Sequence, residues 1–216
     1  MRLLTISDLH GNLDAAWAAI EAAEPDVFLS CGDWGDPDQV ALADLELISE
    51  RVPVYTVYGN HDPLEALAEW VNQDGSPVLL QSGELQRVGQ LAVAGINGIW
   101  AKSHRKPFYV TDEDVDEAAL RVAGQGAPVD ILLSHACPSG VADVTRANRH
   151  GGQRCFLRAF QVLRPRVYLT GHLHRAQEHR TRDGQVVRNV GHTPSGDATL
   201  IVAGPDGLEV TPFEFS

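Results

Sequence analysis

Short apolar runs alternate with helical segments in the first part of the chain, and this alternation limits the folds that the chain can adopt. Leu3 to Ile6, Asp26 to Leu29 and Val52 to Val57 are rich in apolar and β-branched residues, which predicts strands. Leu13 to Ala23 and Asp38 to Glu50 lie between them and have the composition of helices. Such repetition predicts an α/β sheet of parallel strands that are buried on both faces.

The second half of the sequence has a different pattern. Six short strands are expected, at Val78 to Val88, Gln90 to Ala94, Ala176 to Thr181, Gln185 to Asn189, Thr199 to Val202 and Leu208 to Thr211. Asp-Gly turns separate the last two pairs, which is typical of hairpins. Between these strands we expect helices at about Asp112 to Val122 and Gln153 to Leu163, and strands at Asp130 to Ser134 and Arg166 to Thr170. We therefore expect a mixed α/β (α+β) chain whose second half is mostly antiparallel.

Composition limits the domain number and the class of partner. The 216 residues, of which 44% are hydrophobic, can form one buried core, so we expect a single domain over residues 1–216. The formal net charge of -12 argues against a surface for duplex nucleic acid but leaves room for a nucleotide in a pocket. Three cysteines without a C-x-x-C pair predict neither a disulfide framework nor a cysteine zinc site. The N-terminal apolar run is too short for a signal peptide or a membrane span, so we expect a cytoplasmic protein.

Five clusters of aspartate, histidine and asparagine each follow an apolar strand directly. They are Asp8-Leu9-His10, Gly32-Asp33-Trp34-Gly35-Asp36, Gly59-Asn60-His61-Asp62, Ser134-His135 and Gly171-His172-Leu173-His174. The carboxyl ends of parallel strands meet in one crevice, so five loops can deliver side chains to the same place. Mixed oxygen and nitrogen donors suit divalent ions such as manganese, iron, cobalt or zinc better than calcium. The glycines before Asp33, Asn60 and His172 would permit sharp turns and close approach of the backbone.

These five clusters, in this order, resemble the calcineurin-like metallophosphoesterase superfamily over Asp8 to His174. The resemblance implies a two-sheet β-sandwich flanked by helices. It also implies two divalent metal ions, with manganese preferred and iron, zinc, cobalt or nickel as alternatives. One ion would be held by Asp8, His10, Asp33 and His174, and the other by Asp33, Asn60, His135 and His172, so that Asp33 bridges both. A hydroxide between such ions would attack the phosphoryl group.

The same resemblance gives His61 and Asp62 catalytic roles. His61 would contact the phosphate and assist the leaving group, and Asp62 would orient its ring, because a carboxylate on one ring nitrogen fixes the tautomer. Asp36 has two interpretations: it is either a partner of the ligand residues or the N-cap of a helix with Pro37 at its first position. The cap is the favoured interpretation.

The resemblance predicts a phosphoester hydrolase and favours a phosphodiesterase that acts on a nucleotide or small diester. Gly59 to Asp62 has the sequence GNHD, whereas phosphoprotein phosphatases carry GNHE. Gly95 to Trp100, Lys102 to His104 and Asp130 to His135 are also similar to segments of lariat debranching enzymes, which belong to the same superfamily. The alternatives are a phosphomonoesterase and a catalytically silent scaffold of the same fold. A scaffold would have lost ligand residues, and none is missing.

The remaining candidates concern the substrate. They are Asn12, Trp34, which could stack on a base or aryl group, Asn97, Arg149 and His150. Arg149 and His150 belong to the cationic segment 145–152, which ends in two glycines and could reach the substrate or form a plain surface loop. His104, His179 and His192 match no ligand position and are expected in exposed or loop positions.

Overall fold

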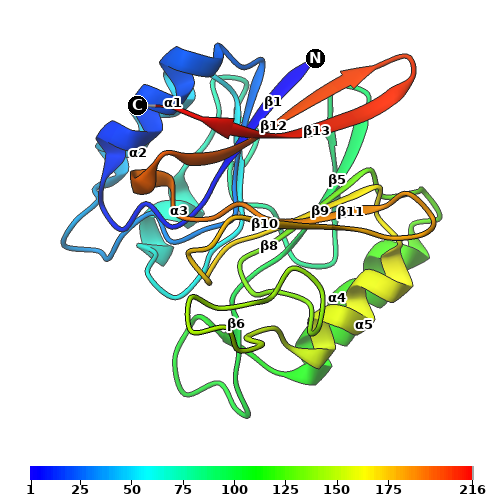
Figure 1. Cartoon of the computed structure of the whole chain (residues 1–216). Coiled ribbons are helices and arrows are strands. Elements are labelled where there is room, and N and C mark those ends of the chain that lie inside the picture. Colours follow the sequence, from blue (N-terminus) through cyan, green and yellow to red (C-terminus); the bar gives the residue numbers. More distant parts are fainter. Residues whose placement is uncertain (216) are drawn as a thin grey trace.

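Two β-sheets packed face to face form the centre of the computed structural model, which describes residues 1–215 (Figure 1). The first sheet has the order β13-β12-β1-β2-β3, with β1 (Arg2–Ile6), β2 (Val27–Ser30), β3 (Val54–Thr56), β12 (Asp197–Gly204) and β13 (Gly207–Glu214). The second has the order β10-β11-β9-β8-β5-β4, with β4 (Leu85–Val88), β5 (Leu91–Ile96), β8 (Ile131–Ser134), β9 (Val167–Thr170), β10 (Gln177–Arg180) and β11 (Val186–Asn189). This arrangement confirms the expected two-sheet sandwich flanked by helices.

Helices cover the outer face of each sheet, as Figure 1 shows. The first sheet carries α1 (Leu13–Ala23), α2 (Leu42–Arg51) and α3 (Leu64–Glu69), and the second carries α4 (Asp112–Gly124) and α5 (Arg154–Leu163). A short pair, β6 (Ile99–Trp100) and β7 (Tyr109–Val110), and a 3₁₀ turn, η1 (Thr193–Ser195), complete the chain. None of these helices has the length and apolar character that crossing a membrane requires.

The strands are apolar on both faces because each sheet lies between two buried layers. Leu3 and Leu29 point into the core between the sheets, and Leu4 and Phe28 point into the core under α1 and α2. Successive side chains of a strand point to opposite faces, so continuous apolar runs fill both cores. This double burial confirms the prediction made for the first part of the chain.

Several sequence expectations differ from the structure. The three expected hairpins are present, but the centre of the second sheet is parallel: β5 pairs with β8, β8 with β9, and β9 with β11, all in parallel. The expectation of a mostly antiparallel second half was therefore wrong for this sheet.

The helices also differ from the expectation. α2 begins at Leu42 instead of Asp38, because a turn precedes it. In this turn the Gln39 and Val40 amides donate to the Asp36 carbonyl. The sequence patterns also did not predict α3.

Gly95 provides a test of the packing between the sheets. A Cβ atom on Gly95 would lie 2.7 Å from Leu80 Cβ and 2.9 Å from Val57 Cγ1, both in the core between the sheets. We expect Gly95→Ala to lower the free energy of unfolding by about 1–3 kcal/mol, because the added methyl group overpacks the core. Urea denaturation measures this loss. The matched control is Gly124→Ala at the end of α4, where no atom lies within 4 Å of the added Cβ. Equal unfolding midpoints for the two variants would contradict the tight packing at Gly95.

Candidate metal centre

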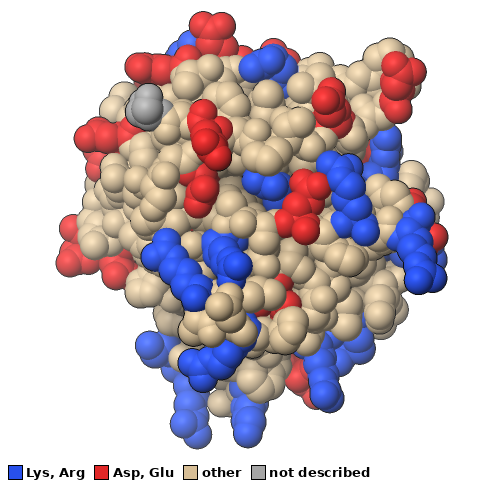
Figure 2. Space-filling view, viewed as in Figure 1, with Lys and Arg blue, Asp and Glu red and all other residues tan. Residues whose placement is uncertain are grey.

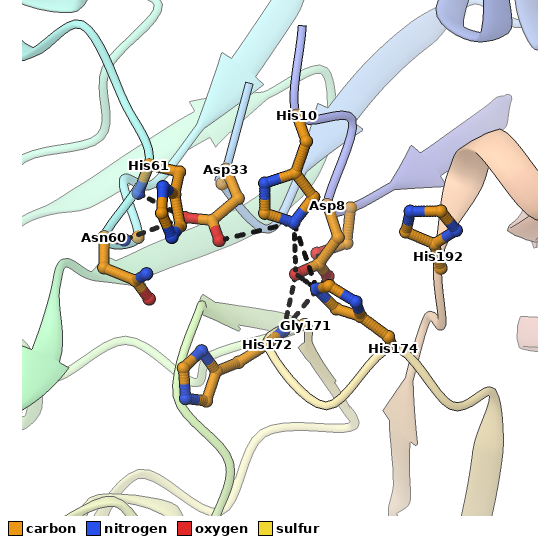
Figure 3. Close-up of polar contacts among 12 residues, drawn as sticks. Asp8, His10, Asp33, Asn60, His61, Gly171, His172, His174 and His192 are labelled. Carbon is orange, nitrogen blue, oxygen red and sulfur yellow. Dashed lines mark hydrogen bonds and ion pairs between the residues drawn. The ribbon is translucent and has the colours of Figure 1, made fainter. Parts of the chain in front are cut away.

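The five predicted ligand loops meet at one edge of the sandwich. Each follows the carboxyl end of a parallel strand, β1, β2, β3, β8 or β9. Backbone hydrogen bonds join the first two loops, since the Asp8 amide donates to the Gly32 carbonyl at 3.0 Å and the His10 amide to the Asp33 carbonyl at 3.0 Å. The predicted ligands from separate parts of the chain are thus brought together, as Figure 3 shows.

Five of the predicted ligand residues have left-handed backbone conformations. They are Asp8 (φ 60°), His10 (φ 48°), Asp33 (φ 59°), His172 (φ 70°) and His174 (φ 51°). This region is uncommon for residues other than glycine and costs free energy, and it concentrates at functional sites. The hydrogen bonds between the loops hold these conformations, which aim the side chains at a common point.

Glycines allow this close approach at three positions. A Cβ on Gly59 would collide with Asp33 Oδ1 and the His135 ring, and a Cβ on Gly171 would collide with Ser7 Oγ and Asp8 Oδ2. A Cβ on Gly32 would lie 2.7 Å from the Gly59 nitrogen, so the expectation of close backbone approach is confirmed at all three. Of the three glycines that precede ligands, Gly32 alone has a positive φ, of 91°, so it alone provides the expected sharp turn.

One group of donors comes from the first and last loops. His10 Nε2 lies 3.0 Å from His174 Nε2, and His174 Nε2 lies 3.1 Å from Asp8 Oδ1 (Figure 3). Asp33 Oδ2 lies 3.9 Å from His10 Nε2. Asp8, His10 and His174 each offer one atom to a common point, which is the arrangement of a metal site.

A second group of donors lies near the same oxygen of Asp33. His135 Nε2 lies 3.2 Å from Asp33 Oδ2, and His172 Nδ1 lies 3.2 Å from His135 Nε2. The other ring nitrogen of His135 contacts the Cys31 carbonyl at 2.8 Å, which directs Nε2 toward the site, as ligand histidines require. Asn60 Oδ1 is buried without a hydrogen-bond partner among the described residues. A buried carbonyl oxygen of this kind needs a partner, and a cation would provide one.

The surroundings of the donors favour the ionised form of Asp33 and the neutral form of His172, which are the forms that bind a metal ion. Burial would raise the pKa of Asp33, but the His135 imidazole and the backbone amide of His61 hold it well below its usual value. Burial and the neighbouring His135 lower the pKa of His172 to about 4, so its ring is neutral at pH 7. Burial would lower the pKa of His135, but Asp33 and Asp8 raise it to about 10. A divalent cation would take the place of that proton.

Asp62 and Asp36 have contacts that differ from those expected. Asp62 does not face His61; its carboxylate accepts backbone hydrogen bonds from Asp33 at 2.8 Å, Trp34 at 2.8 Å and Gly59 at 2.6 Å. His61 Nδ1 instead lies 3.1 Å from Asp36 Oδ1, and both side chains are about half exposed. Asp36 is not a helix cap, because α2 begins only at Leu42. Burial and the charge of Asp33 raise the pKa of Asp62 to about 7, against the three N–H donors that lower it.

Three of the expected substrate residues have structural contacts of their own. Trp34 is fully buried against Trp70 and donates its indole N–H to Thr56 at 2.9 Å, so no face of its ring is free to stack on a substrate. Asn97 is buried; its side chain accepts a hydrogen bond from the Tyr58 amide and donates one to the Leu80 carbonyl. Asn12 caps α1 through the Ala15 amide at 3.3 Å.

The other two expected substrate residues lie on the surface. Arg149 is exposed, and His150 is 70% exposed and contacts Asp143 at 2.7 Å through Nδ1.

The charged side chains are unevenly distributed over the surface. Figure 2 shows that cationic side chains gather over the lower part of the face in view, where the loop with β6 lies, and that carboxylates gather near α1 and α2. The negative net charge is therefore unevenly distributed, with exposed cations such as Lys102, Arg105 and Lys106 in that loop.

His192 belongs to the site, although the sequence patterns assigned it no role. Its ring stacks on His174 with centroids 5.0 Å apart and lies 6.2 Å from the His10 ring (Figure 3). Its Nδ1 lies 2.7 Å from Ser195 Oγ, which holds the ring in place. The signal was present in the sequence: His192 follows β11 after a glycine, as the ligands follow their strands. An antiparallel β11 would have its carboxyl end at the opposite edge, and the parallel pairing with β9 places His192 here.

Known proteins are similar to this chain in sequence or in fold. The sequence model of the family described as "Calcineurin-like phosphoesterase" matches residues 1–176. A lariat debranching enzyme of Caenorhabditis elegans is 23% identical over an alignment that covers 81% of this chain and 47% of that protein, so the chain spans about half of its relative's length. The crystal structure of TT1561 from Thermus thermophilus is similar, with a TM-score of 0.72, 15% identity and 98% of each chain covered. A dimetal phosphatase from Danio rerio has a TM-score of 0.61 and 13% identity, with 100% of this chain and 99% of that chain covered.

Asp62 provides a test of how the ligand loops are held. Asp62→Asn keeps the volume but puts an NH₂ group against backbone N–H donors, and each buried donor left unpaired costs about 1–3 kcal/mol. We expect at least that loss in the free energy of unfolding, measured by urea denaturation. The control is Asp183→Asn, which breaks the exposed pair with Arg164 and should cost less than about 1 kcal/mol. An unchanged midpoint for Asp62→Asn would contradict the anchoring role of this carboxylate.

Proposed function

The chain belongs to the calcineurin-like phosphoesterase family, and we propose that it is a phosphodiesterase that hydrolyses a nucleotide or another small phosphodiester with two divalent metal ions. The observation that carries the proposal is the convergence of buried carboxylates and imidazoles at the strand ends, together with the unpaired Oδ1 of Asn60. A site built only for structure would pair that oxygen within the protein.

The donor set fits two ions that share one carboxylate. Asp8, His10, Asp33 and His174 would hold one ion, and Asp33, Asn60, His135 and His172 the other, with manganese as the first candidate. Such ions, when bound, supply Lewis-acid stabilisation of the phosphoryl oxygens and activate a water for attack. Asp33 lies between both donor groups, so it is the carboxylate whose loss would damage the site most.

His61 would act on the leaving group. Its backbone amide donates to Asp33 Oδ1 at 2.8 Å, which holds the residue beside the donor groups. The Asp36 carboxylate accepts a hydrogen bond from the His61 Nδ1–H group and so orients the ring. As the bond from phosphorus to the leaving oxygen breaks, the protonated ring would give the proton at Nε2 to that oxygen. Asp36 therefore takes the positioning role that the resemblance gave to Asp62.

Two observations favour a diester over a monoester. The sequence of the third loop, GNHD, resembles the diesterase branches of the family. The relative with 23% identity is named a lariat debranching enzyme, and its similarity covers 81% of this chain. The phosphomonoesterase remains the second candidate, since a dimetal phosphatase shares the fold.

A pair of chromogenic esters tests the proposal. We expect the manganese-loaded protein to hydrolyse bis-p-nitrophenyl phosphate with a higher kcat/KM than p-nitrophenyl phosphate. Asp33→Ala should remove hydrolysis and also metal retention, measured as bound manganese after gel filtration, because both donor groups lose their shared carboxylate. A preference for the monoester would overturn the diester assignment. Manganese retention by the Asp33→Ala variant would overturn the bridging role.

A comparison of leaving groups tests the roles of His61 and Asp36. His61→Gln should lower kcat about 10²- to 10⁴-fold for a diester with an alkyl leaving group, and less for a p-nitrophenyl group, which departs without a proton. Asp36→Asn should lower kcat in the same substrate-dependent way, by a smaller factor, with metal content unchanged. The matched control is Asp38→Asn, two residues away on an exposed turn. Equal losses for both leaving groups would show that these residues do not provide the proton.

A further inference from the structure

A cavity of about 590 Å³ opens beside the metal centre, on the side of His61. Three segments form its walls: the turn before α2, the start of α3 and the loop before β7. Asn60 and Asp62, the residues on either side of His61, line it, as does Asp36, whose carboxylate contacts the His61 ring. The cavity thus lies next to the residue that is proposed to protonate the leaving oxygen.

The walls of this cavity are mainly apolar. They include Val40, Leu42, Pro63, Leu64, Pro107 and Phe108. The Phe108 carbonyl accepts a hydrogen bond from the Ile99 amide at 3.0 Å, which fixes the loop that carries the aromatic ring. A cavity of this size with apolar walls and a few polar groups at one end is typical of a small-molecule site.

The charge of the cavity excludes one class of occupant. Its charged side chains are those of Asp36 and Glu65, because the Asp62 carboxylate is turned to backbone amides. None of the described lysine or arginine side chains lines it. Lys106 lies outside, with Nζ 5.3 Å from the centroid of the Phe108 ring. A leaving group with its own phosphate or carboxylate would bring a second negative charge next to these carboxylates, in a partly apolar space.

The geometry points to a leaving-group pocket that selects phosphoesters whose departing alcohol is uncharged and aromatic. This inference rests on the proposed function, because it takes the side of His61 as the side from which the alcohol leaves. The phosphoryl group would sit at the metal centre, and the aromatic body of the alcohol would lie between Leu42, Leu64 and Phe108. Specificity would then come from the loop before β7 and the start of α3 and not from the metal ligands.

Binding of free alcohols tests the pocket without any catalysis. Titration of 2-naphthol with metal-free protein, followed by the fluorescence of the naphthol, should show saturable binding. Phe108→Ala should weaken this binding at least fivefold. 6-Carboxy-2-naphthol should bind at least tenfold more weakly, and Glu65→Gln should recover part of that difference. The control is Leu208→Ala, an apolar residue in a hollow formed by the β12–β13 hairpin, which should leave binding unchanged. Equal binding of the two naphthols, or no effect of Phe108→Ala, would overturn the inference.

Hydrolysis then separates the pocket from the proposed reaction. The substrates are phosphodiesters that join methanol to each of the two naphthols. The diester of 2-naphthol should have at least a tenfold higher kcat/KM than the diester of 6-carboxy-2-naphthol. Phe108→Ala should raise the KM for the 2-naphthol diester with little change in kcat. If 2-naphthol binds but neither diester is hydrolysed, the proposed function is overturned and the proposed pocket is supported. Equal hydrolysis of both diesters, unaffected by Phe108→Ala, would keep the proposed function and overturn the pocket.

Discussion

The Asp62 carboxylate ties together the two loops on which the metal centre depends. It accepts hydrogen bonds from the Asp33 and Trp34 amides in the loop after β2 and from the Gly59 amide in the loop after β3. Because Asp33 in turn accepts from the Asn60 and His61 amides, each loop is fixed by a side chain of the other. This reciprocal bonding places the shared ligand Asp33 beside Asn60 and His61, and the other donors are arranged around it.

Left-handed backbone at five donor residues shows what this arrangement costs. Each such residue stores free energy that the sheets and the loop contacts must offset. The donors also hold negative charge close together, since Asp8 and Asp33 are both buried and both have pKa values below the usual range. Bound cations would relieve this repulsion, so metal binding and the stability of the loops are expected to be coupled.

The sequence predicted the elements whose signal is local, and it was less informative where distant segments meet. The donor residues could be identified because each follows a strand and the order of the clusters is specific. The carboxylate that contacts His61 could not be identified, since the choice lies between its neighbour in the chain, Asp62, and Asp36, 25 residues away. Trp34 was expected to stack on a substrate because it stands in a ligand loop, but this loop turns it into the core with Trp70.

The direction of β11 explains the remaining omission and connects fold to site. Sequence pattern correctly paired β10 with β11 as a hairpin, yet the parallel pairing of β11 with β9 involves residues that are not neighbours in the chain. Because parallel neighbours end at the same edge of a sheet, this pairing brings His192 to the edge where His174 lies. The same rule places the ends of β1, β2, β3, β8 and β9 at that edge, so strand direction, more than any single motif, determines which side chains reach the metal centre.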